Sequence, residues 1–256
     1  MNRTKRLHES YRLHESFLDD IITNFDKKGS DYGNQDRNSL KLFQLEGKTL
    51  NVKSFRIPNV VNQIAYRFFR KSKAQRSFEY AIRLKSLNIG TPDPVAYYEY
   101  TTSLLFKNSY YISQHLDYDL TYRELTKDLN YPNHEEILRA FTRFTYKLHE
   151  NNVEFLDHSP GNTLIKITPN GYDFYLVDLN RMKFHAMDLD LRIKNFAKLT
   201  VHESMVAVMS DEYAKCAHVS SEMVFTKMWK CTQDFQERFW RRRRLKNKVL
   251  FWRRKP

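Results

Sequence analysis

The segment EFLDHSPGNTLI, residues 154–165, places a carboxylate, a histidine and a carboxamide within a few positions of one another. Asp157 and Asn162 lie five residues apart in it, and Asp178 follows the next apolar stretch. Two carboxylates and a carboxamide suit Mg²⁺, which takes few protein ligands and completes its shell with water and phosphate oxygens. A polar turn is the alternative, because Asp, Ser, Pro, Gly and Asn are residues that turns prefer.

The flanking elements decide whether these three side chains can meet. Residues 134–152 show a 3.6-residue apolar period, which predicts a helix before the segment. Its apolar side carries Ile137, Phe141, Phe144 and Leu148. Residues 163–180 predict a hairpin with Asn170-Gly171 as a candidate type I′ turn. A hairpin returns the chain to its starting level, so we expect Asp178 to lie beside Asp157 and Asn162.

The N-terminal half predicts a β-rich region with one long helix. Residues 39–58 alternate around Glu46-Gly47-Lys48 as a hairpin does, and residues 94–100 and 103–116 are strand-like. Residues 60–88 carry apolar residues at helical spacing up to Gly90, a plausible stop. The remainder, to about Gln236, is mostly helical in pattern.

The first residues repeat RLHES at 6–10 and 12–16, and we interpret them as the solvated side of a helix reaching about Phe25. A metal site built from His8 and His14 is the sharper alternative. It is disfavoured, because a spacing of six puts the two rings on different faces of a helix.

Two residues of the N-terminal half favour a functional site over a polar turn at residues 154–165. Lys53 lies in a predicted strand with apolar neighbours, and Glu79 lies within the predicted long helix. A strand lysine is usually just solvated. A strand lysine, a helix glutamate, Asp-x-x-x-x-Asn and a strand-terminal Asp, in this chain order, are nevertheless the parts of kinase-type phosphoryl transfer.

The chain resembles the lipopolysaccharide core kinases, the Kdo-kinase and heptose-kinase relatives of the protein-kinase fold. The resemblance rests on four stretches between about residues 30 and 200: VKSF near Lys53, RKSKAQRSFE at 70–79, GTPDPVA at 90–96 and LHENNVEFLDHSPGN at 148–162. It implies an α+β fold of two lobes, a small β-rich N-lobe with one long helix and a larger, mainly helical C-lobe.

The resemblance also implies a role for each residue. Asp157 would be the catalytic aspartate that orients the acceptor hydroxyl and accepts its proton. Asn162 and Asp178 would hold Mg²⁺. Lys53 would grip the phosphates of ATP, and Glu79 would pair with Lys53. Residues 111–115, which include Gln114, would form the hinge against which adenine packs.

The sequence departs from the kinase pattern in three places. It has Phe155-Leu156-Asp157 for His-Arg-Asp and Asp178-Leu179-Asn180 for Asp-Phe-Gly, and neither change removes a metal ligand or the base. The phosphate-covering segment, residues 29–39, has only Gly29 and Gly33, where Arg37 and Asn38 could substitute as donors to phosphate. His158 is expected to pack or to contact the acceptor rather than act as a second base.

The formal net charge of +13 indicates an anionic partner. Residues 238–255 hold ten Lys or Arg and no acid, and one helical stripe there is apolar. The stripe comprises Phe235, Phe239, Leu245, Val249 and Trp252. A basic amphipathic helix of this kind is typical of an anionic membrane surface. A solvated terminal helix without a binding role is the alternative for this tail, and nucleic-acid binding is disfavoured.

These observations predict four segments: a helical extension (1–28), an N-lobe (29–116), a C-lobe (117–236) and a basic tail (237–256). Two cysteines are too few for a disulfide framework, and the scattered charges of residues 1–22, without an apolar stretch, predict that this segment is not a secretory signal. We therefore expect a cytoplasmic enzyme, peripheral on the inner face of the inner membrane.

The expected reaction transfers the γ-phosphoryl group of ATP, with Mg²⁺, to a sugar hydroxyl of the lipopolysaccharide core. Kdo on a lipid A precursor is the first acceptor to consider. The alternatives are a heptose kinase, another small-molecule or protein kinase of the same fold, and a membrane-associated pseudokinase scaffold.

Overall fold

The computed structural model describes residues 1–33 and 38–249, which fall into two compact units. The first unit comprises Met1–Asp117 and Tyr175–Arg181, and the second comprises Tyr118–Phe174 and Met182–Pro256. The chain therefore passes between the units three times. A short stretch that contains Asp178 belongs to the first unit, although most residues around it in sequence belong to the second.

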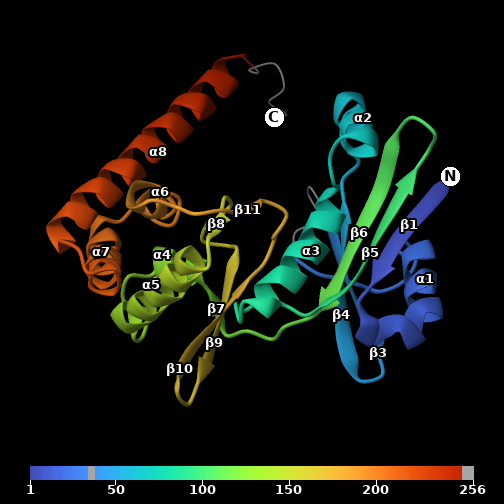
Figure 1. The fold of residues 1–256 in the computed structure, drawn as a ribbon, viewed down its shortest axis with the longest axis horizontal. Helices are drawn as coiled ribbons and strands as arrows, with labels where there is room; N and C mark the ends of the chain where they lie inside the picture. Colours follow the sequence, from blue (N-terminus) through green and yellow to red (C-terminus); the bar gives the residue numbers. More distant parts are fainter. Residues whose placement is uncertain (34–37, 250–256) are drawn as a thin grey trace. The chain divides into compact units, whose positions relative to one another are not determined.

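The first unit is built on an antiparallel sheet in the order β1-β5-β6-β4-β3-β2 (Figure 1). Its strands are β1 (Asn2–Leu7), β2 (Ser30–Asp31), β3 (Asn38–Leu45), β4 (Lys48–Phe55), β5 (Pro94–Thr101) and β6 (Phe106–Gln114). The β3–β4 hairpin turns at Glu46-Gly47, both with positive φ, and the predicted hairpin is confirmed. The strands expected over 94–100 and 103–116 are also confirmed.

Helices cover both faces of this sheet. On one face, buried residues of α1 (Glu15–Thr23) pack in a single cluster with Leu50, Tyr98 and Ile112. On the other, Phe78 of α3 (Lys73–Ser86) packs with Phe55 and Tyr97. Side chains alternate along a strand, so Lys53 shares the α3 face with Phe55. Its Nζ lies 5.3 Å from the centre of the Phe55 ring.

The helix expected over the first 25 residues is wrong at its beginning. Residues 2–7 form β1, which pairs with β5 from Asn2–Thr101 to Leu7–Ala96; a 3₁₀ helix η1 (Glu9–His14) and α1 follow. Arg3 and Lys5, which alternate along β1, both form ion pairs with Asp19 of α1, at 2.9 and 2.7 Å. Pairing with the edge of β5 satisfies backbone groups that local sequence would have placed in a helix.

The single long helix expected between residues 60 and 88 is in fact two helices. The helix α2 (Val60–Phe68) ends where Phe69 and Arg70 both donate their N–H to the carbonyl of Ala65, at 2.9 and 2.8 Å. A new helix, α3, then begins because the Ser72 hydroxyl accepts the N–H of Gln75 at 3.0 Å. A serine in this position satisfies a donor that the helix start leaves unpaired.

The second unit is mainly helical, as predicted. Its helices are α4 (Tyr122–Lys127), α5 (His134–Glu150), α6 (Leu189–Lys194), α7 (Glu203–Ala217) and α8 (Ser221–Val249). Short strands β7 (Leu120–Thr121), β8 (Val153–Phe155), β9 (Thr163–Thr168) and β11 (Met182–Phe184) accompany them, and β10 (Gly171–Leu176) pairs with β9. Among the described helices, none is long and apolar enough to cross a membrane.

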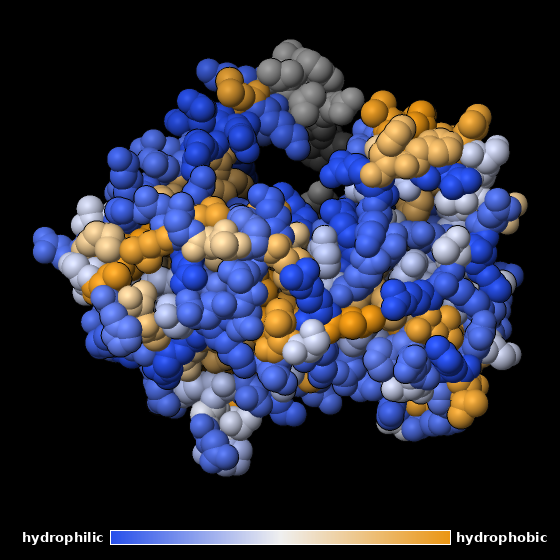
Figure 2. All heavy atoms as spheres, viewed as in Figure 1, coloured by the Kyte–Doolittle hydropathy of each residue, from blue (hydrophilic) through white to orange (hydrophobic). Residues whose placement is uncertain are grey.

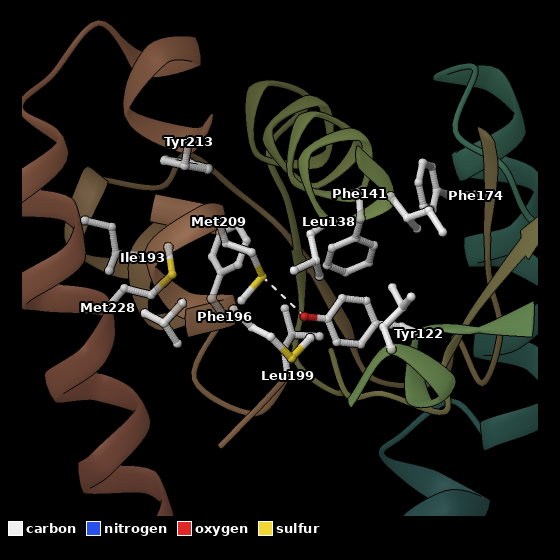
Figure 3. Packing of buried hydrophobic residues seen from close by; sticks show 14 of the residues in the cluster. Tyr122, Leu138, Phe141, Phe174, Ile193, Phe196, Leu199, Met209, Tyr213 and Met228 are labelled. Atoms are coloured by element: carbon white, nitrogen blue, oxygen red, sulfur yellow. Dashed lines mark hydrogen bonds between the residues drawn. The ribbon is translucent and has the colours of Figure 1, made fainter. Parts of the chain in front are cut away.

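The core of the second unit gathers around α5, whose predicted apolar side is confirmed. Ile137, Phe141 and Leu148 are buried. In Figure 3 the Tyr122 hydroxyl points at the sulfur of Met209, 3.3 Å away, among the packed side chains of α5, α6 and α7.

The β9–β10 hairpin forms, but its turn is not type I′. A type I′ turn needs positive φ at both central residues. Here Gly171, the first residue of β10, has φ of 123°, and Asn170 is not among the residues with positive φ. Pro169 and Asn170 occupy the turn, which fits the preference for Pro at the first central position and Gly after the second.

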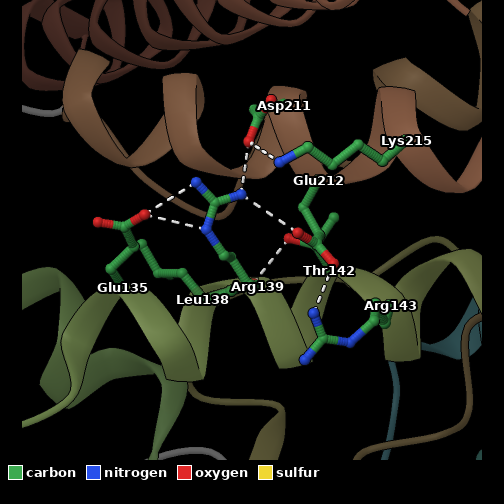
Figure 4. A network of polar contacts seen from close by, with 8 residues as sticks. All are labelled: Glu135, Leu138, Arg139, Thr142, Arg143, Asp211, Glu212 and Lys215. Atoms are coloured by element: carbon green, nitrogen blue, oxygen red, sulfur yellow. Dashed lines mark hydrogen bonds and ion pairs between the residues drawn. The ribbon is translucent and has the colours of Figure 1, made fainter.

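An ion-pair network joins α5 to α7 (Figure 4). Arg139 contacts Glu135, Asp211 and Glu212, and Arg143 contacts Glu212 at 2.5 Å. Burial by itself would raise the pKa of Glu212, but hydrogen bonds from the two arginines outweigh it and lower this pKa. Glu212 is thus the buried carboxylate on which both arginines converge.

We expect Glu212→Gln to lower the free energy of unfolding by about 1–3 kcal/mol, because it removes a charged acceptor shared by two arginines. Urea unfolding followed by circular dichroism measures the change. Glu135→Gln is the matched control, since Glu135 also binds Arg139 but is exposed, and it should cost about 0.5 kcal/mol or less. Equal costs would show that burial of Glu212 does not matter.

Candidate functional site

Lys53 and Asp178 form an ion pair inside the first unit. Lys53 Nζ lies 2.5 Å from Asp178 Oδ1, and their side chains are 17% and 33% exposed. The Asn180 amide donates to the same oxygen at 2.8 Å. Among the residues that the structure describes, Asp178 Oδ2 has no hydrogen-bond partner, which leaves one carboxylate oxygen available to a ligand.

Asp178 adopts an unusual backbone conformation. Its φ is 58°, in the left-handed region, which side chains other than glycine rarely occupy. The preceding residues are anchored in the first unit: Leu176 donates its N–H to Gly90 at 2.9 Å, and Thr91 donates its hydroxyl to the Leu176 carbonyl at 2.8 Å. Non-glycine residues in this region concentrate at functional sites, so the conformation marks Asp178 as a candidate.

The expected ion pair between Lys53 and Glu79 is wrong for this structure. Glu79 Oε2 accepts from Lys71 at 2.7 Å, and Oε1 accepts from Gln75 at 3.0 Å. Gln75 precedes Glu79 by one helical turn, and Lys71 lies just before the start of α3. Both oxygens are therefore used locally, while the charge of Lys53 is neutralised by Asp178.

The other predicted N-terminal residues have varied surroundings. Gly33 has φ of 66° after β2, with open space where a side chain would lie. Arg37 lies outside the described residues. Gln114 ends β6 and donates its side-chain amide to the Tyr11 hydroxyl at 2.5 Å.

Asp157 and Asn162 lie together in the second unit, in the loop between β8 and β9. The Asn162 amide donates to the Asp157 carbonyl at 2.8 Å, and its backbone N–H donates to Ser159 at 3.0 Å. Because the amide nitrogen is used, the carbonyl oxygen of Asn162 is the end left for a ligand. It has no hydrogen-bond partner among the described residues.

Sequence reasoning missed Lys198, which lies beside this loop. Lys198 Nζ donates to the carbonyl of Leu156 at 2.5 Å and lies 4.0 Å from Asp157 Oδ1. It follows α6 and is distant from the loop in sequence. No spacing rule connects the two, because the contact depends on how α6 packs.

Arg123 of α4 is a second cation at the loop that the sequence did not indicate. A Cβ added to Gly161 would lie 2.5 Å from the Arg123 guanidinium, so the arginine lies directly against the backbone of this glycine. Within the described part of the chain, the guanidinium has no ion-pair partner.

Behind the loop lies a buried hydrogen-bonded group centred on Asn195. Its amide nitrogen donates to the carbonyl of Phe155 at 2.9 Å, and its oxygen contacts ring nitrogens of His158 and His149 at 3.4 and 3.3 Å. The second nitrogen of His149 contacts the Tyr213 hydroxyl at 2.8 Å. Since the Asn195 oxygen can only accept, both histidines donate to it.

His158 is a packing residue. It is buried against Phe141, Phe155 and Phe196, and its Nε2 is buried without a partner among the described residues. Burial lowers the pKa of His158 to about 4. The expectation that it is not a second base is consistent with this position, since a buried neutral ring has no path to an acceptor.

No protein-family model matches the chain, and no curated protein matches it by sequence. A solved structure described as "WaaP in complex with acyl carrier protein" is similar, with a TM-score of 0.63 and 14% identity. The match covers 92% of this chain and 97% of that one. This chain has a two-lobed, protein-kinase-like fold.

The predicted fold class is thereby confirmed, with its β-rich N-terminal sheet and helical C-terminal part. The fold alone does not give the activity. In all, 1083 chains of solved structures match, and widely used folds carry many activities. The activity of this chain therefore depends on the side chains of the candidate site.

The two buried histidines predict a loss of stability in mild acid. Burial lowers the pKa of His149 to about 3 and that of His158 to about 4, whereas an unfolded histidine titrates at about 6.5. Below about pH 6.5 these two histidines bind protons in the unfolded chain but stay neutral in the folded chain. The free energy of unfolding should fall by roughly 1 kcal/mol per pH unit for each histidine down to about pH 4.

Urea unfolding at a series of pH values measures this slope. His158→Leu should reduce it by about half. His218→Asn is the matched control, because His218 is exposed at the end of α7, and it should leave the slope unchanged. A wild-type slope in His158→Leu would contradict the assignment.

Proposed function

We propose that this chain is an ATP-dependent kinase that phosphorylates a sugar hydroxyl of the lipopolysaccharide inner core, with Kdo on a lipid A precursor as the acceptor. The fold and the sequence resemblance support a kinase of this class. The observation that carries the proposal is Asp178, a carboxylate in left-handed backbone conformation, held by Lys53 and Asn180 with one oxygen left over.

Each of the two predicted ligands has an oxygen of the kind that Mg²⁺ prefers. Asp178 offers a carboxylate oxygen and Asn162 a carboxamide oxygen, and Mg²⁺ in kinases takes few protein ligands and fills its shell with water and phosphate. The two residues belong to different units, so each is argued from its own surroundings. When bound, Mg-ATP would supply the transferable phosphoryl group and a cation that neutralises its charge.

The chain's own residues supply the rest of the mechanism. Asp157 would orient the acceptor hydroxyl and take its proton as transfer completes. Lys53 would leave Asp178 for the phosphates of ATP, a small change for a partly exposed ammonium group. Lys198 would hold the loop through the Leu156 carbonyl and place a positive charge beside Asp157, where charge develops during transfer. Gly33, Arg37 and Gln114 remain proposed contributors to ATP binding, whereas Glu79 is held by Lys71 and Gln75.

An acidic acceptor is supported by the cations around the loop. Kdo carries a carboxylate, and Arg123 presents a guanidinium beside Gly161, in the same loop as Asp157. Arginine binds carboxylates through two parallel hydrogen bonds. Heptose has no carboxylate, so Arg123 favours Kdo as the acceptor.

The basic tail would bring the enzyme to a membrane-bound acceptor. The described end of α8 exposes Phe239, Trp240 and Leu245 among arginines and lysines. Cations near an anionic leaflet are attracted to it, and aromatic residues settle at the headgroup level. We therefore propose peripheral attachment on the cytoplasmic side of the inner membrane.

Asp157→Asn and Asp178→Asn should each reduce phosphoryl transfer by at least about 10³-fold while the circular dichroism spectrum is kept. Transfer is measured from radiolabelled Mg-ATP to Kdo-lipid A. Asp173→Asn, an exposed aspartate on β10, is the control and should retain activity. Near wild-type activity in Asp178→Asn would remove the metal assignment.

The same assay separates the alternatives. Phosphorylation of heptose-bearing core but not of Kdo-lipid A would change the acceptor. Wild-type protein that binds lipid normally but transfers no phosphate to either would be a pseudokinase scaffold.

The two cations of the loop should differ in kinetics. Lys198→Met should lower kcat by about 10–100-fold with little change in KM for the acceptor, and Lys198→Arg should retain most activity. Arg123→Gln should raise KM for the acceptor by about tenfold with kcat nearly unchanged. Lys194→Met, at an exposed lysine of α6, is the control. Equal effects of the Lys198 and Arg123 substitutions on KM alone would contradict the separate roles.

A further inference from the structure

The helix α2 has its apolar side facing solvent. Val60, Val61, Ile64 and Phe68 recur at helical spacing and are all exposed, and Ile57 and Phe69 extend the same surface at its two ends. Val61 is 76% exposed and Phe69 81%. We call these six residues the α2 patch. Figure 2 shows apolar atoms gathered where α2 lies in Figure 1.

The polar side of α2 faces the protein instead. Gln63 is buried and donates its amide to the Pro58 carbonyl at 2.9 Å, while Arg67 donates to the Thr102 carbonyl at 3.2 Å. The Gln63 carbonyl oxygen is buried without a partner in the described residues. The helix α2 thus turns polar groups toward the protein and exposes valine and phenylalanine. This orientation suits a contact outside the unit.

The charge around the α2 patch indicates what that contact is. No Asp or Glu occurs between Glu46 and Glu79, a stretch that carries eight basic residues. They are Lys48, Lys53, Arg56, Arg67, Arg70, Lys71, Lys73 and Arg76. Arg56, Arg70 and Lys71 are exposed and adjoin the two ends of the patch.

We propose that the α2 patch inserts into the surface of an anionic lipid bilayer. Apolar residues would enter the boundary between headgroups and acyl chains, and Arg56 and Arg70 at the two ends of the patch would bind lipid phosphates. A protein partner is less well matched, because residues 47–78 carry no carboxylate and the partner would need acidic groups opposite both Arg56 and Arg70. This contact lies in the first unit, is separate from the tail proposed above and does not depend on phosphoryl transfer.

Co-sedimentation of the full-length protein with vesicles tests the proposal, without ATP. Vesicles of phosphatidylcholine mixed with phosphatidylglycerol are compared with phosphatidylcholine alone. The double variant Val61→Gln/Phe69→Gln should bind the anionic vesicles at least about tenfold more weakly than wild type. Leu13→Gln is the matched control, because Leu13 is 97% exposed in the same unit but has no apolar neighbours of this kind, and it should bind as wild type.

Insertion itself is read from an environment-sensitive fluorophore. NBD is attached to Val61→Cys or Leu13→Cys after Cys216 and Cys231 are replaced by alanine. NBD at residue 61 should shift to the blue and brighten with anionic vesicles, and NBD at residue 13 should not. An unchanged spectrum at residue 61 overturns the proposal.

Two further outcomes also overturn it. Wild-type binding by Val61→Gln/Phe69→Gln would assign lipid attachment to another surface, such as the tail. A dimer that becomes a monomer in this variant, with lipid binding unchanged, would assign the patch to a contact between two copies of the chain.

Discussion

The segment that displays Asp178 depends on a balance between backbone strain and a few anchoring contacts. A non-glycine residue in the left-handed region costs of order 1–3 kcal/mol. The ion pair with Lys53 is partly exposed, and such pairs contribute about 1 kcal/mol or less. Lys53 alone therefore does not hold the conformation. The hydrogen bonds of Leu176 with Gly90 and Thr91 fix the chain two residues before Asp178, and Asn180 adds a third contact at the carboxylate itself.

These separate roles of the backbone anchors and of Lys53 bear on the proposed phosphoryl transfer. Because the backbone is anchored by Gly90 and Thr91, Lys53 can exchange its partner without releasing Asp178 from position. A lysine that belongs to β4 is itself rigidly placed, since Phe55 and Tyr111 pack around the same face of the sheet. The ammonium group is then the mobile part, and the two main chains that carry it and the carboxylate are fixed. Electrostatic catalysis requires charges that are placed before the reaction begins, so this arrangement supports the proposed function.

The sequence predicted those parts of the fold that local patterns encode. The α5 helix followed from its 3.6-residue period, and the β3–β4 hairpin from alternation around Glu46-Gly47. The break between α2 and α3 was missed although its signal was present, because Ser72 with Gln75 three residues later is a helix-start pattern. The strand β1 carried no such signal. Its pairing with β5 and its ion pairs to Asp19 are contacts between distant parts of the chain.

The contacts of the candidate site residues were predicted only in part, for the same reason. Asp157, Asn162, Lys53 and Asp178 could be named from spacing and chain order. The partners of Lys53 and Glu79 could not, because Lys71 and Gln75 compete locally for the glutamate and Asp178 competes for the lysine. No sequence pattern indicated Lys198 and Asn195, because both follow α6 and contact the loop only through the tertiary fold.

These two missed residues hold the loop at the positions where Phe155 and Leu156 stand in place of the His and Arg of the kinase pattern. Asn195 holds the carbonyl of Phe155 and Lys198 holds the carbonyl of Leu156, so consecutive peptide groups before Asp157 are fixed through the backbone. The side chains of Phe155 and Leu156 therefore need no hydrogen bonds to hold the loop, and Phe155 is fully buried against His158. His158 fills the space between Phe141 and Phe196 as a neutral ring. Asn195 and Lys198 hold this loop from outside it, and the apolar side chains of the loop shield these hydrogen bonds from water.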